Sequence, residues 1–406
     1  MGNNKIVLLS TGQPSLNPRL VKEADALANS GYEVTVLYSY WNQWGAELDK
    51  ILLPSKSWKA ICIGGDPHQR PFAYLCSKLI FRASKIINRI LKGGQFAELA
   101  IARNSFFLKR AAKQFEADIY IGHNLGALPA TVMAAAVNKK PCGFDAEDFH
   151  RNEVSNDDRH PDVVIKTYLE NKYFPSLGYL SVSSPLIAAA YLKIFPGLAP
   201  RVILNVFPKG KDSSEPAKNG GGPVRLFWFS QTIGHGRGLE EVIEAMDALT
   251  PYPFELHLLG QPDHSFRDAY RQKESIHFHA PIPSERIFFF ASQFDIGLAV
   301  ETGVPFNRDI CLTNKIFTYI QSGLCVVASD TKAQSLFMSE YPGVGKVYTK
   351  RKPQELANIL LHYHQHKDKL IEARRTALAL AANELNWELE RGKFLGLVEQ
   401  TLHGHQ

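Results

Sequence analysis

Acidic residues and a histidine follow two apolar segments in the first half of the chain, and their types suit acid–base chemistry. His123 comes directly after the segment DIYIG, and Asp145 and Glu147 come after PCGF. Carboxylates and an imidazole at neighbouring strand ends can position a hydroxyl nucleophile or neutralise developing charge. A lone histidine after a strand is more often structural, but the acidic run DAEDFHRNE is denser than a solvated loop needs. We therefore predict a catalytic site at His123, Asp145 and Glu147.

A glycine-rich turn in the second half of the chain has the residue types of a phosphate site. The segment QTIGHGRGLEE places Gly236 and Gly238 on either side of Arg237. Glycines between a strand and a helix let the backbone approach a phosphate, and the guanidinium can donate two hydrogen bonds to it. The segment matches neither GxGxxG nor the P-loop, so a flexible turn with a surface arginine is the alternative interpretation.

An acid and a helix start form a third candidate site. Glu301 follows the apolar segment DIGLAV, and Asn314 and Lys315 begin a predicted helix, NKIFTYIQSG. The acid could hold sugar hydroxyls, while the lysine and the free amides of the helix start hold a diphosphate. An N-cap beside an ordinary loop acid is the alternative interpretation.

Short apolar segments alternate with longer amphipathic ones, which is the pattern of parallel sheets covered by helices on both faces. In the first half, the predicted strands are KIVLLS, EVTVLYSY, DIYIGHN, PCGFDA and GYLSVSS, and the stretch 41–58 is expected to be loop-rich. In the second half, they are VRLFWFS, FELHLLG, SIHFHA, DIGLAV and LCVVAS. The first helix is predicted to begin near Pro18 and to end at Gly31. Such sheets bind ligands at the carboxyl ends of their strands, where all three candidate sites fall.

The segment 208–223 contains three prolines and four glycines and separates the two series of strands. Such a composition cannot pack a core and predicts a linker. At 406 residues, the chain is long enough for two domains. We predict an α/β fold of two doubly wound, Rossmann-like domains, at 1–207 and 224–382, with a cleft between them. A C-terminal helix at 383–406 is predicted to pack back toward the first domain.

Composition and charge exclude several classes of protein. Hydrophobic residues make up 45% of the chain and charged residues 21%, which indicates a globular rather than a disordered chain. No apolar run is long enough to span a bilayer, and the start of the chain lacks the core of a signal peptide. The five cysteines are scattered without CxxC spacing, as in a reducing compartment. We therefore expect a cytoplasmic protein.

The net charge of the chain is +6, but the positive charge is concentrated in one strongly basic region. Residues 70–115 carry ten Lys or Arg and a single acid. Within 75–92, the cations fall on one stripe of a predicted helix, beside an apolar face. Such a helix could dock on an anionic membrane surface, or it could pack its apolar face inward and leave a solvated basic edge. Nucleic acid is not expected as a partner, because neither an RNA-binding signature nor a basic–aromatic strand is present.

Several segments together carry a resemblance of nearly the whole chain to glycosyltransferase family 4, which has the GT-B architecture. The segment NKIFTYIQSGLCVVASD resembles the signature NKxFEYMAxGxPVVAS and is the most specific match. GHNLGALPA resembles the segment with the donor-site histidine, and FDAEDFHRNE resembles the block near the acceptor. QTIGHGRGLEEVIEA resembles the segment whose basic residue grips the nucleotide diphosphate. Thr318 stands where the family usually has a second acid.

The resemblance implies a hexosyltransferase that moves a sugar from a nucleotide-diphosphate sugar to a glycan or lipid-linked acceptor. It further implies retention at the anomeric carbon and a place in surface polysaccharide or glycolipid synthesis. The implied donor-binding residues are Arg237, Gly236, Gly238, Glu301, Asn314, Lys315 and Thr318, and the acceptor-side residues are Asp148, His150 and Glu153.

We expect neither a metal nor a cofactor, because the chain has no DxD motif in a strand context and the histidines of HYHQH lack a third ligand. Two alternatives to a transferase stay open. One is a nucleotide-sugar 2-epimerase of the same fold, and the other is a non-catalytic subunit that binds a nucleotide-sugar.

Overall fold

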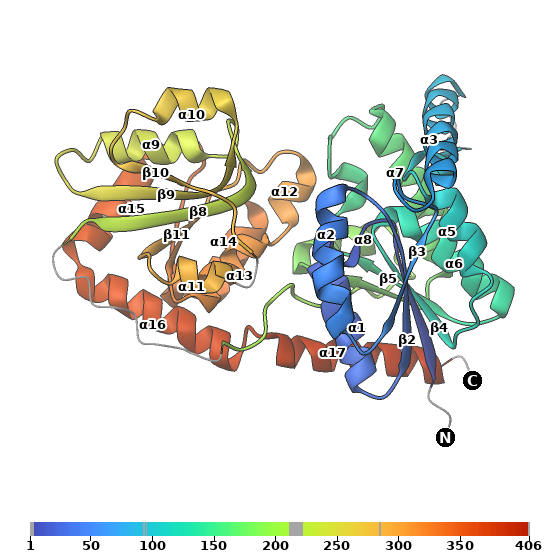
Figure 1. The fold of residues 1–406 in the computed structure, drawn as a ribbon. Helices are drawn as coiled ribbons and strands as arrows, with labels where there is room; N and C mark the ends of the chain where they lie inside the picture. Colours follow the sequence, from blue (N-terminus) through green and yellow to red (C-terminus); the bar gives the residue numbers. More distant parts are fainter. Residues whose placement is uncertain (1–3, 92–93, 95, 211–221, 284–285, 405–406) are drawn as a thin grey trace. The chain divides into compact units, whose positions relative to one another are not determined.

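The structure is a computed structural model that describes residues 4–91, 94, 96–210, 222–283 and 286–404. The chain forms two compact units, each built around one parallel sheet (Figure 1). The first unit comprises Met1–Leu204, Pro305–Asn307 and Arg391–Gln406, and the second comprises Asn205–Val304 and Arg308–Glu390. Most of the predicted linker, residues 211–221, lies outside the described residues.

The first sheet has seven strands in the order β3-β2-β1-β4-β5-β6-β7. They are β1 (Lys5–Ser10), β2 (Glu33–Ser39), β3 (Lys59–Ile63), β4 (Ile119–His123), β5 (Cys142–Ala146), β6 (Tyr179–Val182) and β7 (Arg201–Val202). The register pairs Ser10 of β1 with His123 of β4, and His123 with Asp145 of β5. The carboxyl ends of these central strands therefore meet at one edge, where such sheets bind ligands.

The helices of the first unit connect these parallel strands. They are α1 (Pro18–Asn29), α2 (Gln43–Leu52), α3 (Pro71–Leu91), α4 (Ala97–Ala100), α5 (Ser105–Ala112), α6 (Leu128–Asn138), α7 (Pro161–Tyr173) and α8 (Pro185–Ile194). The local sequence fixes the bounds of α1. Pro18 occupies its first turn, and the Asn17 side chain accepts a hydrogen bond from the Leu20 amide. Gly31, with a φ of +90°, ends it in the left-handed conformation that glycine adopts most easily.

The second sheet has six strands in the order β10-β9-β8-β11-β12-β13. They are β8 (Val224–Ile233), β9 (Phe254–Pro262), β10 (Ile276–His279), β11 (Ile296–Ala299), β12 (Cys325–Ser329) and β13 (Gly345–Tyr348). The helices in this half of the chain are α9 (Leu239–Asp247), α10 (His264–Tyr270), α11 (Ile287–Ala291), α12 (Phe306–Ile310), α13 (Asn314–Gln321), α14 (Lys332–Glu340), α15 (Pro353–Gln365), α16 (Lys367–Asn383) and α17 (Trp387–His403). From Arg391 on, α17 belongs to the first unit. Short 3-10 helices are η1 (Pro14–Leu16), η2 (Leu53–Ser55), η3 (Leu125–Ala127), η4 (His150–Asn152), η5 (Phe174–Ser176) and η7 (Pro342–Val344).

Alternate residues of the central strand β8 face the two helical layers of the second unit. Trp228 is fully buried in a core with residues of α9 and α15, including Val242 and Leu356. Phe227 points to the other layer, where its ring contacts Tyr319 of α13. The sheet is thus covered on both faces, which explains why its inner strands β11 and β12 are apolar runs.

The structure confirms the predicted α/β fold of two Rossmann-like domains. The expectation of a loop-rich stretch at 41–58 is wrong, because this stretch contains α2 and leads into β3. The Asn42 side chain accepts a hydrogen bond from the Gly45 amide at 2.7 Å and so caps α2, while Trp58 is buried before β3. Among the described residues, no helix combines the length and the apolar character needed to cross a membrane.

Candidate functional site

The carboxyl edge of the first sheet holds a buried cluster of charged side chains. Asp145 of β5 accepts hydrogen bonds from Nε and Nη2 of Arg19 at 2.7 Å each. Ser181 Oγ donates a further one at 2.8 Å. Burial alone would raise the pKa of Asp145, but the Arg19 guanidinium outweighs it, and the pKa is lowered. Asp145 is therefore a fixed anion, held by an arginine of α1 that is only 1% exposed.

His123, at the end of β4, lies between two acids of this cluster. Its Nε2 is 3.1 Å from Glu23 Oε2, and its Nδ1 is 3.7 Å from Asp145 Oδ2. Burial disfavours the charged imidazole, but the Glu23 and Asp145 carboxylates together outweigh burial, so the pKa of His123 is raised. The imidazole is buried, and both of its ring nitrogens face carboxylates of the first unit.

Glu147, directly after β5, is largely but not fully buried at this edge. Burial of its carboxyl raises the pKa to about 7, and the neighbouring Asp148 carboxylate adds to the rise. Ser183 Oγ donates a hydrogen bond to the Glu147 carbonyl oxygen and so fixes the backbone there. A carboxyl that titrates near neutral pH can both hold and release a proton, as general acid–base chemistry requires.

The three residues predicted on the acceptor side are tied into the first unit. Asp148 Oδ1 accepts a hydrogen bond from Asn307 Nδ2 at 2.8 Å. His150 Nδ1 lies 3.4 Å from Glu153 Oε2, which also binds Lys166 Nζ at 2.7 Å. Burial would raise the pKa of Glu153, but its contacts with His150 and Lys166 lower it to about 2. These contacts anchor the loop after β5 to α7.

At the carboxyl edge of the second sheet, Lys315 and Glu301 form a largely buried ion pair. Lys315 Nζ is 2.7 Å from Glu301 Oε1 and 5.4 Å from the ring centre of Trp228 in β8. Ser329 Oγ accepts a hydrogen bond from the Glu301 amide and donates one to the Glu301 carbonyl, both at 2.9 Å. The ammonium is thus held between β8 and β11 in the first turn of α13, where the helix dipole adds positive potential.

Arg237 lies in the turn between β8 and α9. Its Nη1 is 3.2 Å from Ser230 Oγ, and its Nη2 is 2.9 Å from Thr232 Oγ1. Both hydroxyl groups belong to β8, so the strand that carries the turn also orients the guanidinium. Because β8 and β11 are adjacent and parallel, Arg237 and the Lys315–Glu301 pair belong to the same edge of the sheet.

The glycine-rich turn is partly committed to internal contacts. Gly238 has a φ of +81°, and a Cβ there would lie 3.2 Å from Val300 Cβ, so a side chain would be both strained and crowded. The Gly236 amide donates a hydrogen bond to Glu240 Oε1 at 3.0 Å, and His235 Nδ1 lies 3.0 Å from the same oxygen. A phosphate bound at this amide would therefore have to displace the Glu240 carboxylate.

Two further residues predicted for donor binding make contacts within the second unit. Thr318 is 2% exposed, and its hydroxyl donates a hydrogen bond to the Asn314 carbonyl at 2.9 Å. Asn314 Oδ1 accepts a hydrogen bond from Asn205 Nδ2 at 3.0 Å. Helical threonines commonly bond the preceding turn in this way. The side chains of Thr318 and Asn314 are thus engaged within the second unit, whereas the Glu301 carboxylate lies at the carboxyl edge of the sheet, beside Lys315.

Three residues of these clusters escape the sequence analysis. Arg19 and Glu23 lie in α1 among its buried apolar residues. A cation and an anion spaced i and i+4 inside an apolar stripe are a signal that could identify such a pair, because charged side chains are rarely buried singly. Trp228 stands inside an apolar strand, where the sequence does not distinguish it from any other core residue.

Among the described residues, neither edge holds three His, Cys, Asp or Glu side chains whose ligand atoms all lie within 4.8 Å of one another. The group of three that these residues do form, Glu255, His257 and His277, lies on β9 and β10. The two edges instead offer cations, carboxylates and one carboxyl that titrates near pH 7.

Two parallel sheets in Rossmann-like strand order define the class of this protein as the GT-B fold. No family profile matches the sequence, and no curated protein sequence matches it either.

Several solved structures are similar in fold to nearly the whole chain. Anabaena HepE in complex with UDP is 15% identical, with a TM-score of 0.67, and the match covers 98% of this chain and 100% of that chain. A variant of S. aureus TarM in complex with fondaparinux, α-GlcNAc-glycerol and UDP is 10% identical, with a TM-score of 0.68 and coverage of 97% and 99%. Sucrose-phosphate synthase from Thermosynechococcus elongatus is 13% identical, with a TM-score of 0.65 and coverage of 99% and 100%.

Proposed function

We propose that this protein is a glycosyltransferase that moves a sugar from a nucleotide-diphosphate sugar to an acceptor. The observation that carries the proposal is the pair of cations at one sheet edge, Arg237 after β8 and Lys315 in the first turn of α13. Departure of a nucleoside diphosphate develops negative charge, which preorganised cations and a helix start stabilise. Structures of the same fold support it, since HepE is described with UDP and with UDP-glucose, and TarM with UDP.

The remaining donor-side residues take different roles in this proposal. Glu301 accepts hydrogen bonds from hydroxyl groups of the donor, because its carboxylate is already held at the edge. Gly236 and Gly238 keep side chains away from the diphosphate. Asn314 and Thr318 shape the start of α13, since their side chains are bonded within the second unit.

On the first unit, we assign the acid–base role to Glu147. Its carboxyl follows β5 and has a pKa of about 7, so it can accept a hydrogen bond from an acceptor hydroxyl or give up a proton at physiological pH. Asp145 and His123 are positioning residues in this proposal. Locked to Arg19 and Glu23, they fix the end of β5 from which Glu147 projects.

The finer assignment follows the resemblance to glycosyltransferase family 4. We propose a hexosyl donor, transfer with retention at the anomeric carbon and without a metal ion, and a role in surface polysaccharide or glycolipid synthesis. The anomeric configuration of the product, read by NMR, tests retention directly.

A thermal-shift panel of UDP-, GDP-, dTDP- and ADP-sugars tests the proposal, because a ligand that binds the native state raises its melting temperature. We expect one nucleotide series to stabilise the protein and an acceptor to trigger release of the nucleoside diphosphate. Conversion of the donor sugar without any acceptor would instead indicate a 2-epimerase. Binding without turnover would indicate a non-catalytic subunit, and stabilisation by no nucleotide-sugar would overturn the proposal.

Helix α3 exposes its apolar face. Phe72 is 80% exposed, Ile86 61% and Ile90 71%. The residues that α3 buries are small or polar: Ser77, Ser84 and Asn88. The interpretation in which the apolar face packs inward is therefore wrong.

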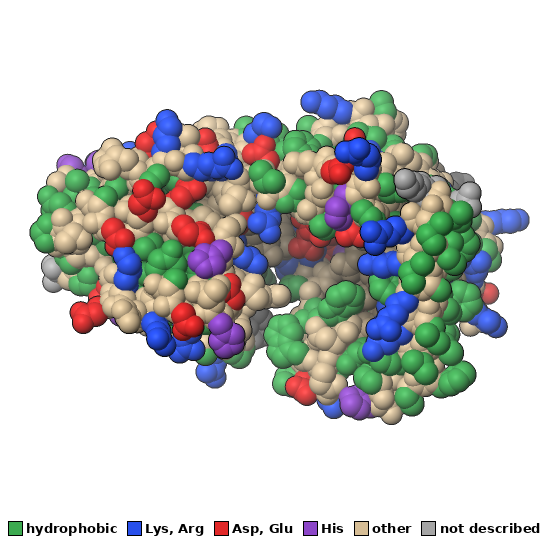
Figure 2. Space-filling model, turned by 90° about the horizontal axis from the view of Figure 1, so that it is seen from above, with side chains coloured by type: hydrophobic (Ala, Val, Ile, Leu, Met, Phe, Trp, Pro, Cys, Tyr) green, Lys and Arg blue, Asp and Glu red, His purple; other side chains and the backbone are tan. Residues whose placement is uncertain are grey.

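Basic side chains flank this apolar face, and α3 contains no acid. They are Lys78, Arg82, Lys85 and Arg89. On the side of the molecule where α3 lies, Figure 2 shows hydrophobic side chains gathered beside Lys and Arg. Apolar residues beside cations suit the headgroup region of an anionic bilayer. We propose that α3 docks the protein peripherally on the cytoplasmic face of such a membrane, where a lipid-linked acceptor would be found.

A further inference from the structure

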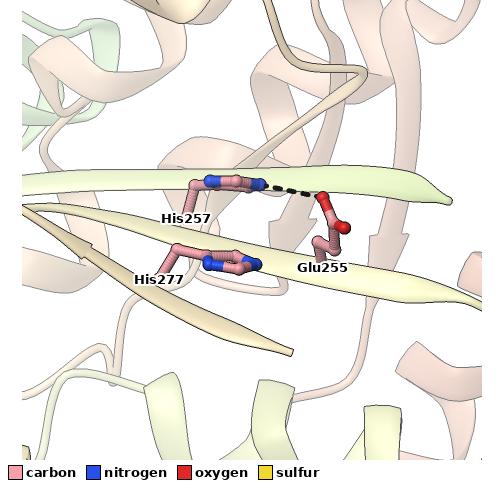
Figure 3. A group of neighbouring side chains, drawn as sticks. All are labelled: Glu255, His257 and His277. Carbon is pink, nitrogen blue, oxygen red and sulfur yellow. Dashed lines mark hydrogen bonds and ion pairs between the residues drawn. The ribbon is translucent and has the colours of Figure 1, made fainter. Parts of the chain in front are cut away.

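Three histidines and a glutamate share one face of the strands β9 and β10. Glu255 and His257 alternate along β9, and the register places His277 of β10 directly beside His257. The residue between the first two, Leu256, points to the opposite face and into the core. Figure 3 shows Glu255, His257 and His277 projecting on the same side of the two strands. β10 is the edge strand of its sheet, so this cluster lies at a sheet margin.

The ligand atoms of this cluster are spaced as a metal ion requires. Glu255 Oε2 and His257 Nε2 are 3.3 Å apart, and one ligand atom from each of the three residues lies within 4.8 Å of the others. Tetrahedral zinc with bonds of about 2.0 Å separates its ligands by about 3.3 Å. One pair is already at that spacing, and the third ligand atom lies within 4.8 Å of both.

The surroundings of the cluster complete the chemistry of a metal site. His257 Nδ1 lies 3.0 Å from His279 Nε2, so the ring nitrogen that faces away from Glu255 has a partner that fixes the imidazole. His277 Nε2 is buried and has no hydrogen-bond partner among the described residues. Buried polar atoms are normally satisfied, so this nitrogen calls for a ligand. The rings of Phe294 and Phe290 pack against His257 and His279 and limit access of water.

We propose that Glu255, His257 and His277 bind a zinc ion, with His279 as a positioning residue behind His257. Two imidazoles and one carboxylate are ligands that zinc accepts in a site with an open fourth position. Glu255 and His257 lie in the N-terminal half of β9, whereas Arg237 and Lys315 belong to the carboxyl edge of the sheet. The ion would therefore tie the edge strand β10 to β9 and stabilise the second unit, without a part in the transfer chemistry.

Titration of the full chain, stripped with EDTA and dialysed, tests the site with Zn²⁺ and with Co²⁺ as a spectroscopic probe. We expect one equivalent of Co²⁺ to give the absorption of a four-coordinate ion and Zn²⁺ to displace it. His277→Gln and Glu255→Gln should each weaken Zn²⁺ binding by more than tenfold. His279→Gln should weaken it by about 10–100-fold, as loss of a second-shell partner does. Glu255→Gln changes a partly exposed side chain, so it keeps the test valid if His277→Gln does not fold.

A second pair of histidines provides the matched control. His362, in the last turn of α15, and His366, the residue that follows this helix, stack at 4.6 Å and could bind metal weakly by themselves. The double variant His362→Gln/His366→Gln should bind Zn²⁺ and Co²⁺ as the wild type does. The proposal is overturned if this double variant loses the metal, or if Glu255→Gln and His277→Gln bind as tightly as the wild type.

Discussion

At the scale of single residues, the two sheet edges use charge in different ways. In the first unit, Arg19 and Asp145 neutralise each other in the interior, with Glu23 and His123 beside them. Such a cluster costs desolvation energy and fixes geometry rather than adding net stability. In the second unit, Arg237 is partly exposed and held by uncharged hydroxyl groups, which leaves its charge available to an anion. The cation at the second edge is thus placed for binding, whereas the first cluster is placed for support.

Replacing Arg237 or Lys315 with alanine should weaken donor binding. A charge-assisted hydrogen bond to a phosphate contributes about 1.5–3 kcal/mol, so each variant should raise the Kd for the nucleoside diphosphate by about 10–150-fold. Calorimetric titration with UDP, or with whichever diphosphate the thermal-shift panel selects, measures this change. Arg271→Ala is the matched control, because Arg271 is an exposed arginine of the same unit that follows α10. Equal affinities in all four proteins would contradict the cation pair as the diphosphate site.

The raised pKa of Glu147 predicts a pH-dependent stability. The pKa of Glu147 is about 7 in the folded state and 4.5 ordinarily. Between these two pH values, the folded state therefore binds more protons than the unfolded state. Stability therefore falls as pH rises through that window. Glu147→Gln removes this loss, so the variant should gain about 1–3 kcal/mol relative to the wild type between pH 4.5 and pH 8. Urea unfolding at the two pH values measures the difference.

Glu153→Gln is the opposite control for this experiment. The pKa of Glu153 is lowered to about 2, so its stabilising effect is complete above its ordinary pKa and is lost only as pH falls toward 2. The variant should therefore be destabilised at pH 8, and by at least as much at pH 5, where Glu153 also loses a protonated His150 as its partner. A Glu147→Gln variant that gains no stability relative to the wild type as pH rises would show that Glu147 does not titrate near neutral pH.

The sequence pattern predicts where a site residue lies along a strand, but not which distant residue it contacts. Strand ends are visible as the last residues of apolar runs, so the positions of His123, Asp145 and Glu301 follow from the pattern. The partner of Asp145 is not visible, because Arg19 lies in a helix far away in sequence and reaches it only through the sheet order. Likewise, the bond from Thr318 to its own helix depends on a rotamer that the sequence does not specify.

At the scale of secondary structure, α3 departs from the usual relation between a helix and its domain. An amphipathic helix normally buries its apolar stripe, but α3 turns small and polar residues to the protein and leaves Phe72 and Ile90 exposed. The spacing of cations and apolar residues predicts the two faces correctly. It does not determine which face the protein covers, because that depends on the surface against which the helix packs.

Negative charge introduced on the apolar face of α3 should release the protein from membranes. The double variant Ile86→Glu/Ile90→Glu removes two apolar side chains from the proposed contact. It replaces them with carboxylates, which anionic lipid repels. Flotation with vesicles that contain phosphatidylglycerol should recover the wild type and not the variant. Val137→Glu, on the exposed surface of α6, should float as the wild type does. Wild-type binding that is absent, or that is the same on neutral phosphatidylcholine vesicles, would refute docking by α3.

The strands and helices themselves were largely predictable, and the exceptions have a common cause. Both sheets are parallel and covered on both faces, so most of their strands stand out as apolar runs. The strands missing from the prediction, β3, β7 and β13, are edge strands of their sheets. Their sequences, KAICI, RV and GKVY, are short and partly exposed. Short strands at a sheet margin carry little apolar signal, which is why the pattern fails to identify them.

At the scale of the whole molecule, the proposed zinc site and the proposed transfer site should be separable. The cations that would stabilise the leaving diphosphate are side chains of this chain, whereas the histidines of β9 and β10 lie elsewhere in the second unit. Treatment with EDTA should therefore leave the rate of transfer unchanged while lowering the melting temperature. Loss of transfer that Mg²⁺ or Mn²⁺ restores would contradict the metal-independent mechanism.

The two units are not two continuous segments of chain. The first unit is completed by residues 391–406 from the other end of the sequence. Phe394 and Val398 of α17 are fully buried, and a Cβ on Gly178 would lie 3.0 Å from Thr401 Cγ2. The last helix is therefore part of the first unit's packing, and the stability of that unit depends on both ends of the chain.

Phe394→Ala should thus destabilise the first unit although it lies close to the C-terminus. Truncating a fully buried phenylalanine costs about 3–5 kcal/mol, while Gln400→Ala, on the exposed side of the same helix, should stay within about 0.5 kcal/mol of the wild type. Hydrogen exchange resolves where the loss falls: amides of β1, β4 and β5 should lose protection, and those of β8 and β11 should keep it. Diphosphate binding, which depends on the second unit, should survive at temperatures below the transition. Equal loss of protection in both sheets would show instead that the two units unfold as one.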